Sequence, residues 1–225
     1  MNKLGKMITG AIAIAFASTT PLMAGSDDFA GPYIAVSAGS IGAELDGQYT
    51  DNESNVTTGT GGRIAQVGSV EIGYSLPLGD SFFVSVGASM TPGEAEISKA
   101  DDAADAADIT IKAKDFLSYY IAPSISVSEN SAVFVKYGSA EADLNVTGNY
   151  TGTAPNELKG ETMAIGTKTM FPSGLFFSAE AGVTEYDKIT VNDIGNADTG
   201  GNGVTGDATA DPSIAYGAFT VGYKF

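Results

Sequence analysis

The residue types that most often carry enzymatic chemistry are missing from this sequence of 225 residues, which contains no histidine and no cysteine. Histidine is the usual general base near neutral pH, and cysteine thiolates serve as nucleophiles and as ligands for soft metals. A lysine or paired-carboxylate mechanism stays open in principle, but no spacing of such residues indicates one. We therefore predict that the protein is not an enzyme and binds no cofactor.

Clustered acidic residues raise the possibility of a calcium site, because Ca²⁺ prefers several carboxylate oxygens. The stretch ADDAADAAD (100–108) contains Asp101, Asp102, Asp105 and Asp108. The alternative interpretation is a solvated acidic loop, and we favour it. The stretch 195–212 is also acidic and rich in glycine, and we interpret it as a second flexible loop. No metal site is predicted.

A third group of charged residues lies within apolar segments or shortly before them, on the parity opposite to the apolar side chains. Its members are Arg63, Glu71, Lys114, Lys136, Lys168, Glu180 and Lys224. They could form a charged constriction that selects ions in a channel. They could instead form ion pairs that fill the interior of a small barrel, and we favour this second interpretation.

The segments that carry these charges alternate apolar and other residues with a period of two, which is typical of strands with two different faces. Eight such segments are recognisable: 31–40, 70–76, 81–90, 115–127, 131–138, 161–171, 175–183 and 213–225. In a soluble sandwich the polar face would meet water, whereas in a membrane barrel it would face the lumen. Most basic residues lie on strands and the acids crowd between them, and this segregation favours the barrel.

The connections between these segments alternate strictly in length. Three are tight, at 77–80, 128–130 and 172–174, and four are long, at roughly 44–62, 91–108, 141–158 and 186–212. This asymmetry is typical of outer-membrane barrels, which have short periplasmic turns and long extracellular loops. We predict an all-β fold: an eight-stranded antiparallel up-and-down transmembrane β-barrel with three short periplasmic turns and four long extracellular loops, and with both termini at the periplasmic end. Eight strands leave an interior that side chains can fill.

The first 24 residues have the composition of a secretory signal peptide. A basic start with Lys3 and Lys6 precedes a short apolar stretch and a small-residue cleavage site after Ala24. We predict a signal peptide at 1–24 and a barrel domain at 25–225. Loss of the two lysines changes the formal charge from −16 to −18. Nucleic acid is therefore not an expected partner, because phosphate binding needs a basic surface.

The signal peptide, the eight segments and the C-terminal FTVGYKF together resemble the small outer-membrane barrels of the OmpA/OmpX and opacity-porin type. The most specific match is a C-terminal assembly signal formed by Phe219, Val221, Tyr223 and Phe225, which we expect to face lipid. Thr220, Gly222 and Lys224 are expected to face the lumen, where Lys224 would reach a carboxylate. We expect no further domain after this last strand.

This resemblance implies a monomer in the outer membrane of a Gram-negative cell, surrounded by outer-membrane lipid and lipopolysaccharide. It also implies a transient partner, the barrel-assembly machinery, and places specific activity in the loops. The expected role is structural or adhesin-like surface interaction, with a largely plugged lumen and acidic loops. The alternative is a narrow porin-like channel for small solutes or ions.

Overall fold

The computed structural model describes residues 25–51, 53–99, 110–147, 153–195 and 205–225. The predicted signal peptide (1–24) and the acidic residues Asp101, Asp102, Asp105 and Asp108 lie outside these ranges. No helix in the described part of the chain is long and apolar enough to cross a bilayer. The described residues form a short 3₁₀-helix, η1 (Ser26–Phe29), and a set of strands. These strands are β1 (Gly31–Asp51), β2 (Val56–Pro77), β3 (Phe82–Lys99), β4 (Thr110–Ser128), β5 (Ser131–Thr147), β6 (Glu157–Met170), β7 (Leu175–Tyr186), β8 (Ile189–Gly195) and β9 (Thr205–Lys224).

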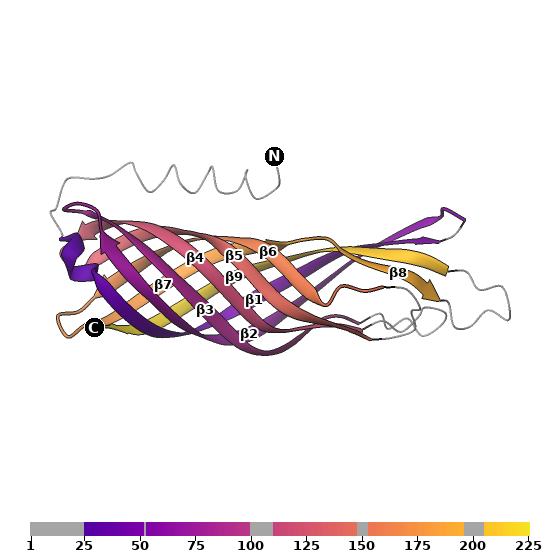
Figure 1. The fold of residues 1–225 in the computed structure, drawn as a ribbon, viewed down its shortest axis with the longest axis horizontal. Coiled ribbons are helices and arrows are strands. Elements are labelled where there is room, and N and C mark those ends of the chain that lie inside the picture. The colour runs from indigo at the N-terminus through magenta and orange to yellow at the C-terminus, as the bar shows by residue number, and fades with distance from the viewer. Residues whose placement is uncertain (1–24, 52, 100–109, 148–152, 196–204) are drawn as a thin grey trace.

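The strands form a closed ring (Figure 1). Each strand from β1 to β7 pairs antiparallel with the next, β7 pairs with β9, and β9 pairs with β1. The short strand β8 also pairs with β9, directly beyond the end of β7, so β7 and β8 together form one side of the wall. The predicted eight-stranded up-and-down barrel is therefore confirmed.

The pairing register determines how steeply the strands tilt. A path across paired residues that starts at Ile34 passes through all eight wall strands and returns to β1 at Glu44, ten residues further along. With about 3.3 Å per residue and about 4.8 Å between strands, this offset corresponds to a tilt of roughly 40°. The tilt brings residues from distant strands to the same height in the lumen.

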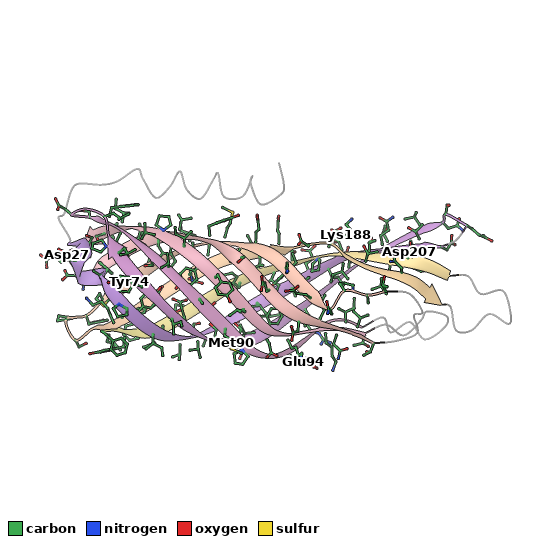
Figure 2. The ribbon with its side chains drawn as sticks, viewed as in Figure 1. Asp27, Tyr74, Met90, Glu94, Lys188 and Asp207 are labelled. Carbon is green, nitrogen blue, oxygen red and sulfur yellow. The ribbon has the colours of Figure 1, made fainter. Side chains whose placement is uncertain are left out.

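The two faces of the wall have opposite chemistry. Large apolar side chains point outward and are exposed, including Ile72 at 58% and Phe219 at 74%. Tyr74 and Met90 lie on this outer face (Figure 2). The inward positions hold small, polar and aromatic side chains, many of them buried, such as Ser85, Lys136 and Thr220. This arrangement follows from the alternation of side chains along a strand.

The strands extend much further at the external end than the apolar alternation predicts. Most of the stretch 44–62, expected to be a loop, is a hairpin in which β1 and β2 stay paired out to Thr50 and Val56. Outside a lipid environment the outer face needs no apolar side chains, so the period-two pattern fades although the backbone pairing continues. The short turns, η1 and the C-terminus lie at the other end of the barrel (Figure 1).

The external end has a hydrophobic core of its own. Its buried residues come from β1, β4, β5, β6, β8 and β9: Leu45, Ile111, Ala113, Ala142, Leu144, Leu158, Ile189, Val191 and Ala210. Burial of these side chains stabilises the external parts of the strands that contribute them, beyond the membrane-facing band.

Candidate functional site in the barrel lumen

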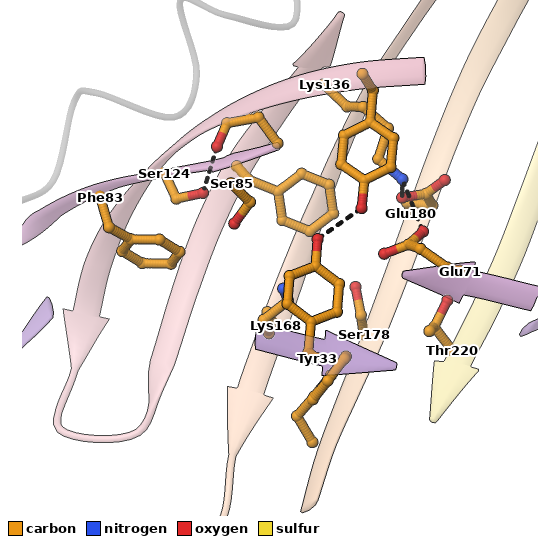
Figure 3. Close-up of a pocket in the computed structure, with 14 residues that line it drawn as sticks. Tyr33, Glu71, Phe83, Ser85, Ser124, Lys136, Lys168, Ser178, Glu180 and Thr220 are labelled. Carbon is orange, nitrogen blue, oxygen red and sulfur yellow. Dashed lines mark hydrogen bonds and ion pairs between the residues drawn. The ribbon is translucent and has the colours of Figure 1, made fainter. Parts of the chain in front are cut away.

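A cluster of three charged side chains lies in the middle of the lumen (Figure 3). Lys136 on β5 donates a hydrogen bond of 2.6 Å to Glu180 Oε2 on β7, and its Nζ lies 3.5 Å from Glu71 Oε2 on β2. All three side chains are only 10–14% exposed. One lysine therefore neutralises one of two carboxylates, and the cluster carries a formal charge of −1.

Two tyrosines extend this cluster across the barrel. The hydroxyls of Tyr33 on β1 and Tyr120 on β4 are hydrogen-bonded at 2.6 Å, and Lys136 Nζ lies 4.4 Å from the centre of the Tyr120 ring. The rings need glycines beneath them: a Cβ at Gly73 or Gly87 would come within 2.4 Å of a tyrosine hydroxyl oxygen. Each glycine is paired directly with its tyrosine on the neighbouring strand, so the absence of a side chain there lets both rings lie close over that strand.

Lys168 occupies a separate place nearer the periplasmic end. Its Nζ lies 4.5 Å from the Tyr33 ring centre and 4.8 Å from the Phe176 ring centre, within the range of cation–π attraction. The two rings meet edge to face at 5.7 Å. A cavity at this level has a volume of about 20 Å³, which is close to the space of a single water molecule.

The periplasmic mouth is covered by the segment that precedes β1. Phe29 of η1 is 1% exposed and stacks on Phe83 at 4.8 Å between ring centres. The backbone N–H of Ser26 donates to the carbonyl of Asp80 at 2.8 Å, and this bond ties η1 to the first short turn. The apolar residues packed here close the lower end of the lumen.

Cross-strand hydroxyl pairs line the rest of the wall. Ser75 and Ser85 are 2.8 Å apart, as are Thr162 and Thr184, and Ser37 is hydrogen-bonded to Ser69. Each pair occupies directly opposed positions on neighbouring strands. These small polar side chains satisfy one another without introducing charge.

The upper lumen, between the charged cluster and the external core, holds a cavity of about 460 Å³. Glu71, Lys136, Glu180 and Tyr120 form its floor. Its walls are mixed: aliphatic and aromatic side chains such as Ile41, Val67, Phe116, Leu158, Ile214 and Tyr216 alternate with serines and threonines, and Glu44, Arg63 and Glu94 add charge. Among the described residues, no group of three or more acidic side chains is arranged to hold a metal ion.

The seven charged residues singled out in the sequence do not all meet. Glu71, Lys136 and Glu180 form the cluster, Lys168 lies below it, and Arg63 borders the upper cavity. Lys224 Nζ donates to the backbone carbonyl of Asp28 at 2.7 Å, so its partner is a carbonyl and not the expected carboxylate.

The prediction that Lys114 faces the lumen is wrong. Its side chain is 47% exposed and lies 3.8 Å from Asp143 on the outer side of β5. A β-bulge shifts the register between Lys114 and Leu117, with Asp115 at φ 54°. Because the bulge adds one residue, the side chains before it change face: Ala113 points inward and is buried in the external core, and Lys114 points outward.

The aromatic members of the site were not identified from the sequence. Tyr33, Phe176 and Phe29 are all buried and face inward. Tyr33 and Phe176 could have been identified from the sequence, because each is an aromatic residue at a position whose parity faces the lumen. The C-terminal residues Phe219, Val221, Tyr223 and Phe225 point outward and are 40–74% exposed. The backbone N–H of Phe225 donates to the carbonyl of Pro32 at 3.0 Å, next to the start of β1.

No protein-family model matches the chain. No curated protein matches it either. Several solved structures resemble it at low sequence identity. Ail, the attachment invasion locus protein of Yersinia pestis, solved with the heparin analogue sucrose octasulfate, is 10% identical over 87% of this chain and 99% of its own, with a TM-score of 0.45. The outer membrane protein OprG of Pseudomonas aeruginosa is 13% identical over 92% and 100%, with a TM-score of 0.49. Neisserial surface protein A is 10% identical over 87% and 97%, with a TM-score of 0.41.

Proposed function

We propose that this protein is an outer-membrane β-barrel whose lumen is closed to ion flow and whose role lies at the cell surface. The observation that carries the proposal is the distribution of side chains on the barrel wall: exposed apolar side chains cover its outer face, and paired charges and hydroxyls line its inner face. Such a continuous apolar outer surface is rare on soluble monomers. Within this apolar band each strand pairs with both neighbours, so the sheet leaves no unpaired edge in hydrocarbon there. Outer-membrane lipid and lipopolysaccharide would surround a monomer, and the barrel-assembly machinery would insert it.

The orientation is tested by surface labelling, which the absence of cysteine makes clean. Thr58→Cys lies on the exposed external part of β2, and Ser173→Cys lies in the exposed short turn after β6. A membrane-impermeant maleimide should label the first variant on intact cells and the second only after the cells are broken. Equal labelling of both variants on intact cells would contradict the proposed topology.

The closed lumen is supported by the charged cluster, the Tyr33–Tyr120 pair and the small volume beneath them. In planar bilayers we expect no steady conductance from the wild-type protein. A control in which Tyr33 and Tyr120 are both changed to alanine removes the two central rings and should open measurable steps. Steady wild-type openings that change with Lys136→Ala or Glu180→Ala would instead establish the alternative, a narrow channel.

The surface role is supported by the long external wall and its charge. Acidic side chains predominate there among the described residues: Glu44, Asp46, Asp51, Glu53, Glu94, Glu141, Asp143, Glu157, Glu161, Glu185, Asp207 and Asp211. Such a surface repels anionic partners and attracts basic ones. Cells that produce the protein should therefore adhere more to polycation-coated than to polyanion-coated surfaces, and the difference should shrink at high salt. Unchanged adhesion relative to cells without the protein would contradict a charge-based surface role.

A further inference from the structure

The barrel wall is incomplete between β2 and β3 in its upper half. Pairing between these strands ends at Val70 and Met90, although β2 continues to pair with β1 as far as Val56. Strand β3 likewise continues beyond Met90 but pairs only with β4. At the external end, the tip of the β1–β2 hairpin and the ends of β3 and β4 diverge (Figure 1). A gap therefore separates the two strands above this point.

The sequence of β3 explains why pairing stops there. Continued register would place Pro92 opposite Gly68, and proline has no N–H to donate to a neighbouring strand. The next residue, Gly93, has φ +122°, and the register with β4 shifts between Thr91 and Glu94. A proline followed by an irregular backbone turns this edge away from β2.

The gap leads directly into the upper cavity. Residues from both edges line that cavity: Gln66, Val67 and Gly68 on β2, and Thr91, Pro92, Gly93 and Glu94 on β3. The charged cluster closes the cavity below. On the external side, Leu158 of the external core and two residues packed against that core, Phe116 and Tyr186, line the cavity, and the described members of this core come from strands other than β2 and β3. The described residues thus leave a sideways route in and out.

The height of the gap matches the margin of the lipid-facing band. Val70 and Met90, each 46% exposed, are the last outward apolar side chains below it on their strands. Above them β2 presents Gly68 and Gln66 before one further exposed apolar side chain, Ile64. Strand β3 presents Pro92 and Glu94, and Glu94 lies beyond Met90 on the outer face (Figure 2). The opening therefore faces the outer edge of the membrane.

The lining indicates what could enter. The cavity volume of about 460 Å³ is in the usual range of small-molecule sites. Its walls offer apolar contact surface from Ile41, Val67, Phe116, Leu158, Ile214 and Tyr216 beside uncharged serines and threonines. Its floor carries two carboxylates and one ammonium group, and Glu44, Arg63 and Glu94 lie at its margin. Such a floor disfavours an anionic headgroup. An uncharged alkyl chain that leaves the bilayer exchanges contacts with lipid for van der Waals contacts with the cavity wall.

We infer that the upper cavity is a binding site for an alkyl chain of an outer-leaflet lipid, which enters sideways between β2 and β3 while its headgroup stays at the membrane surface. The inference rests on the membrane orientation proposed above but not on whether the lumen conducts.

The absence of tryptophan allows a direct test. Phe116→Trp places a single reporter in the upper cavity, and Phe134→Trp places a matched reporter in the closed lower lumen. Both proteins are reconstituted in phosphatidylcholine vesicles with and without bromine on the acyl chains, and heat-modifiable gel mobility confirms that each is folded. The Phe134→Trp variant measures how strongly brominated chains outside the barrel quench tryptophan fluorescence across a wall whose strands are fully paired.

We expect brominated chains to quench the Phe116→Trp reporter at least twofold more than the Phe134→Trp reporter. Adding Ala65→Phe, which fills the cavity beside Ile41, should abolish the excess. Tyr216→Trp serves as a second cavity reporter if Phe116→Trp does not fold. Equal quenching in the upper and lower lumen would overturn the inference, and impermeant-maleimide labelling would show independently whether the membrane orientation holds.

Discussion

The charged cluster makes a strong prediction about stability. Changing Lys136 to methionine keeps most of the side-chain volume but leaves the carboxylates of Glu71 and Glu180 without their shared ammonium group. Their side chains are only 14% and 12% exposed. Removing one partner of a buried ion pair costs about 3–5 kcal/mol, because the remaining charge stays desolvated. Two carboxylates lose their partner here, so we expect a loss of about 4 kcal/mol or more in the free energy of unfolding.

The measurement is urea unfolding in phospholipid vesicles, followed by heat-modifiable gel mobility. The matched control combines Lys136→Met with Glu71→Gln and Glu180→Gln, which removes all three charges while preserving shape. Neutral replacement of a whole buried ionic group is often close to neutral in stability, so the triple variant should recover most of the loss. A loss below about 1 kcal/mol in Lys136→Met, or no recovery in the triple variant, would refute the reasoning.

Two further predictions concern the ends of the barrel. The Asn55 side-chain and backbone amides donate hydrogen bonds to Asp51 and hold the pKa of its carboxyl below the ordinary value. Because the folded-state pKa is lowered, this contact stabilises the hairpin tip above about pH 4, and the stabilisation is lost as the pH falls through the lowered pKa. The Asn55 amide resonances should therefore titrate below the ordinary range, and Asp51→Asn should remove that titration; a midpoint at or above the ordinary value would contradict it. At the other end, Phe225→Ala should lower the amount of folded, heat-modifiable protein in the outer membrane while detergent refolding of the purified chain stays near wild type; an equal loss in both assays would point to stability and not to assembly.

Much of the membrane-facing wall could be predicted because lipid imposes a strict rule. Every second residue must be apolar where a strand crosses hydrocarbon, so segments such as 70–76 and 175–183 identify both their strand and its outer face. The external hairpins escaped prediction for the same reason. Beyond the lipid no such rule applies, and the first residues of β2, Val56–Thr60, are exposed on both faces and mostly polar.

The candidate site was only partly predictable. The alternation pattern predicted that Glu71, Lys136 and Glu180 face the lumen. Their contact with one another depends on the strand tilt, which cannot be deduced from the sequence. The parity of Lys114 failed because a bulge lies between it and the predictable part of β4. A bulge adds one residue without a clear compositional mark, and every side chain beyond it changes face.

The sequence by itself determined the class of the protein: alternating apolar segments, tight and long connections in turn, and no histidine or cysteine to support the usual catalytic chemistry. The tertiary structure alone decided which charges pair, how the Tyr33–Tyr120 bridge crosses the lumen, and where the wall stays open between β2 and β3. The physical reason is that alternation is a local property of one strand. Pairing across the lumen depends on the ten-residue offset that accumulates around the whole ring.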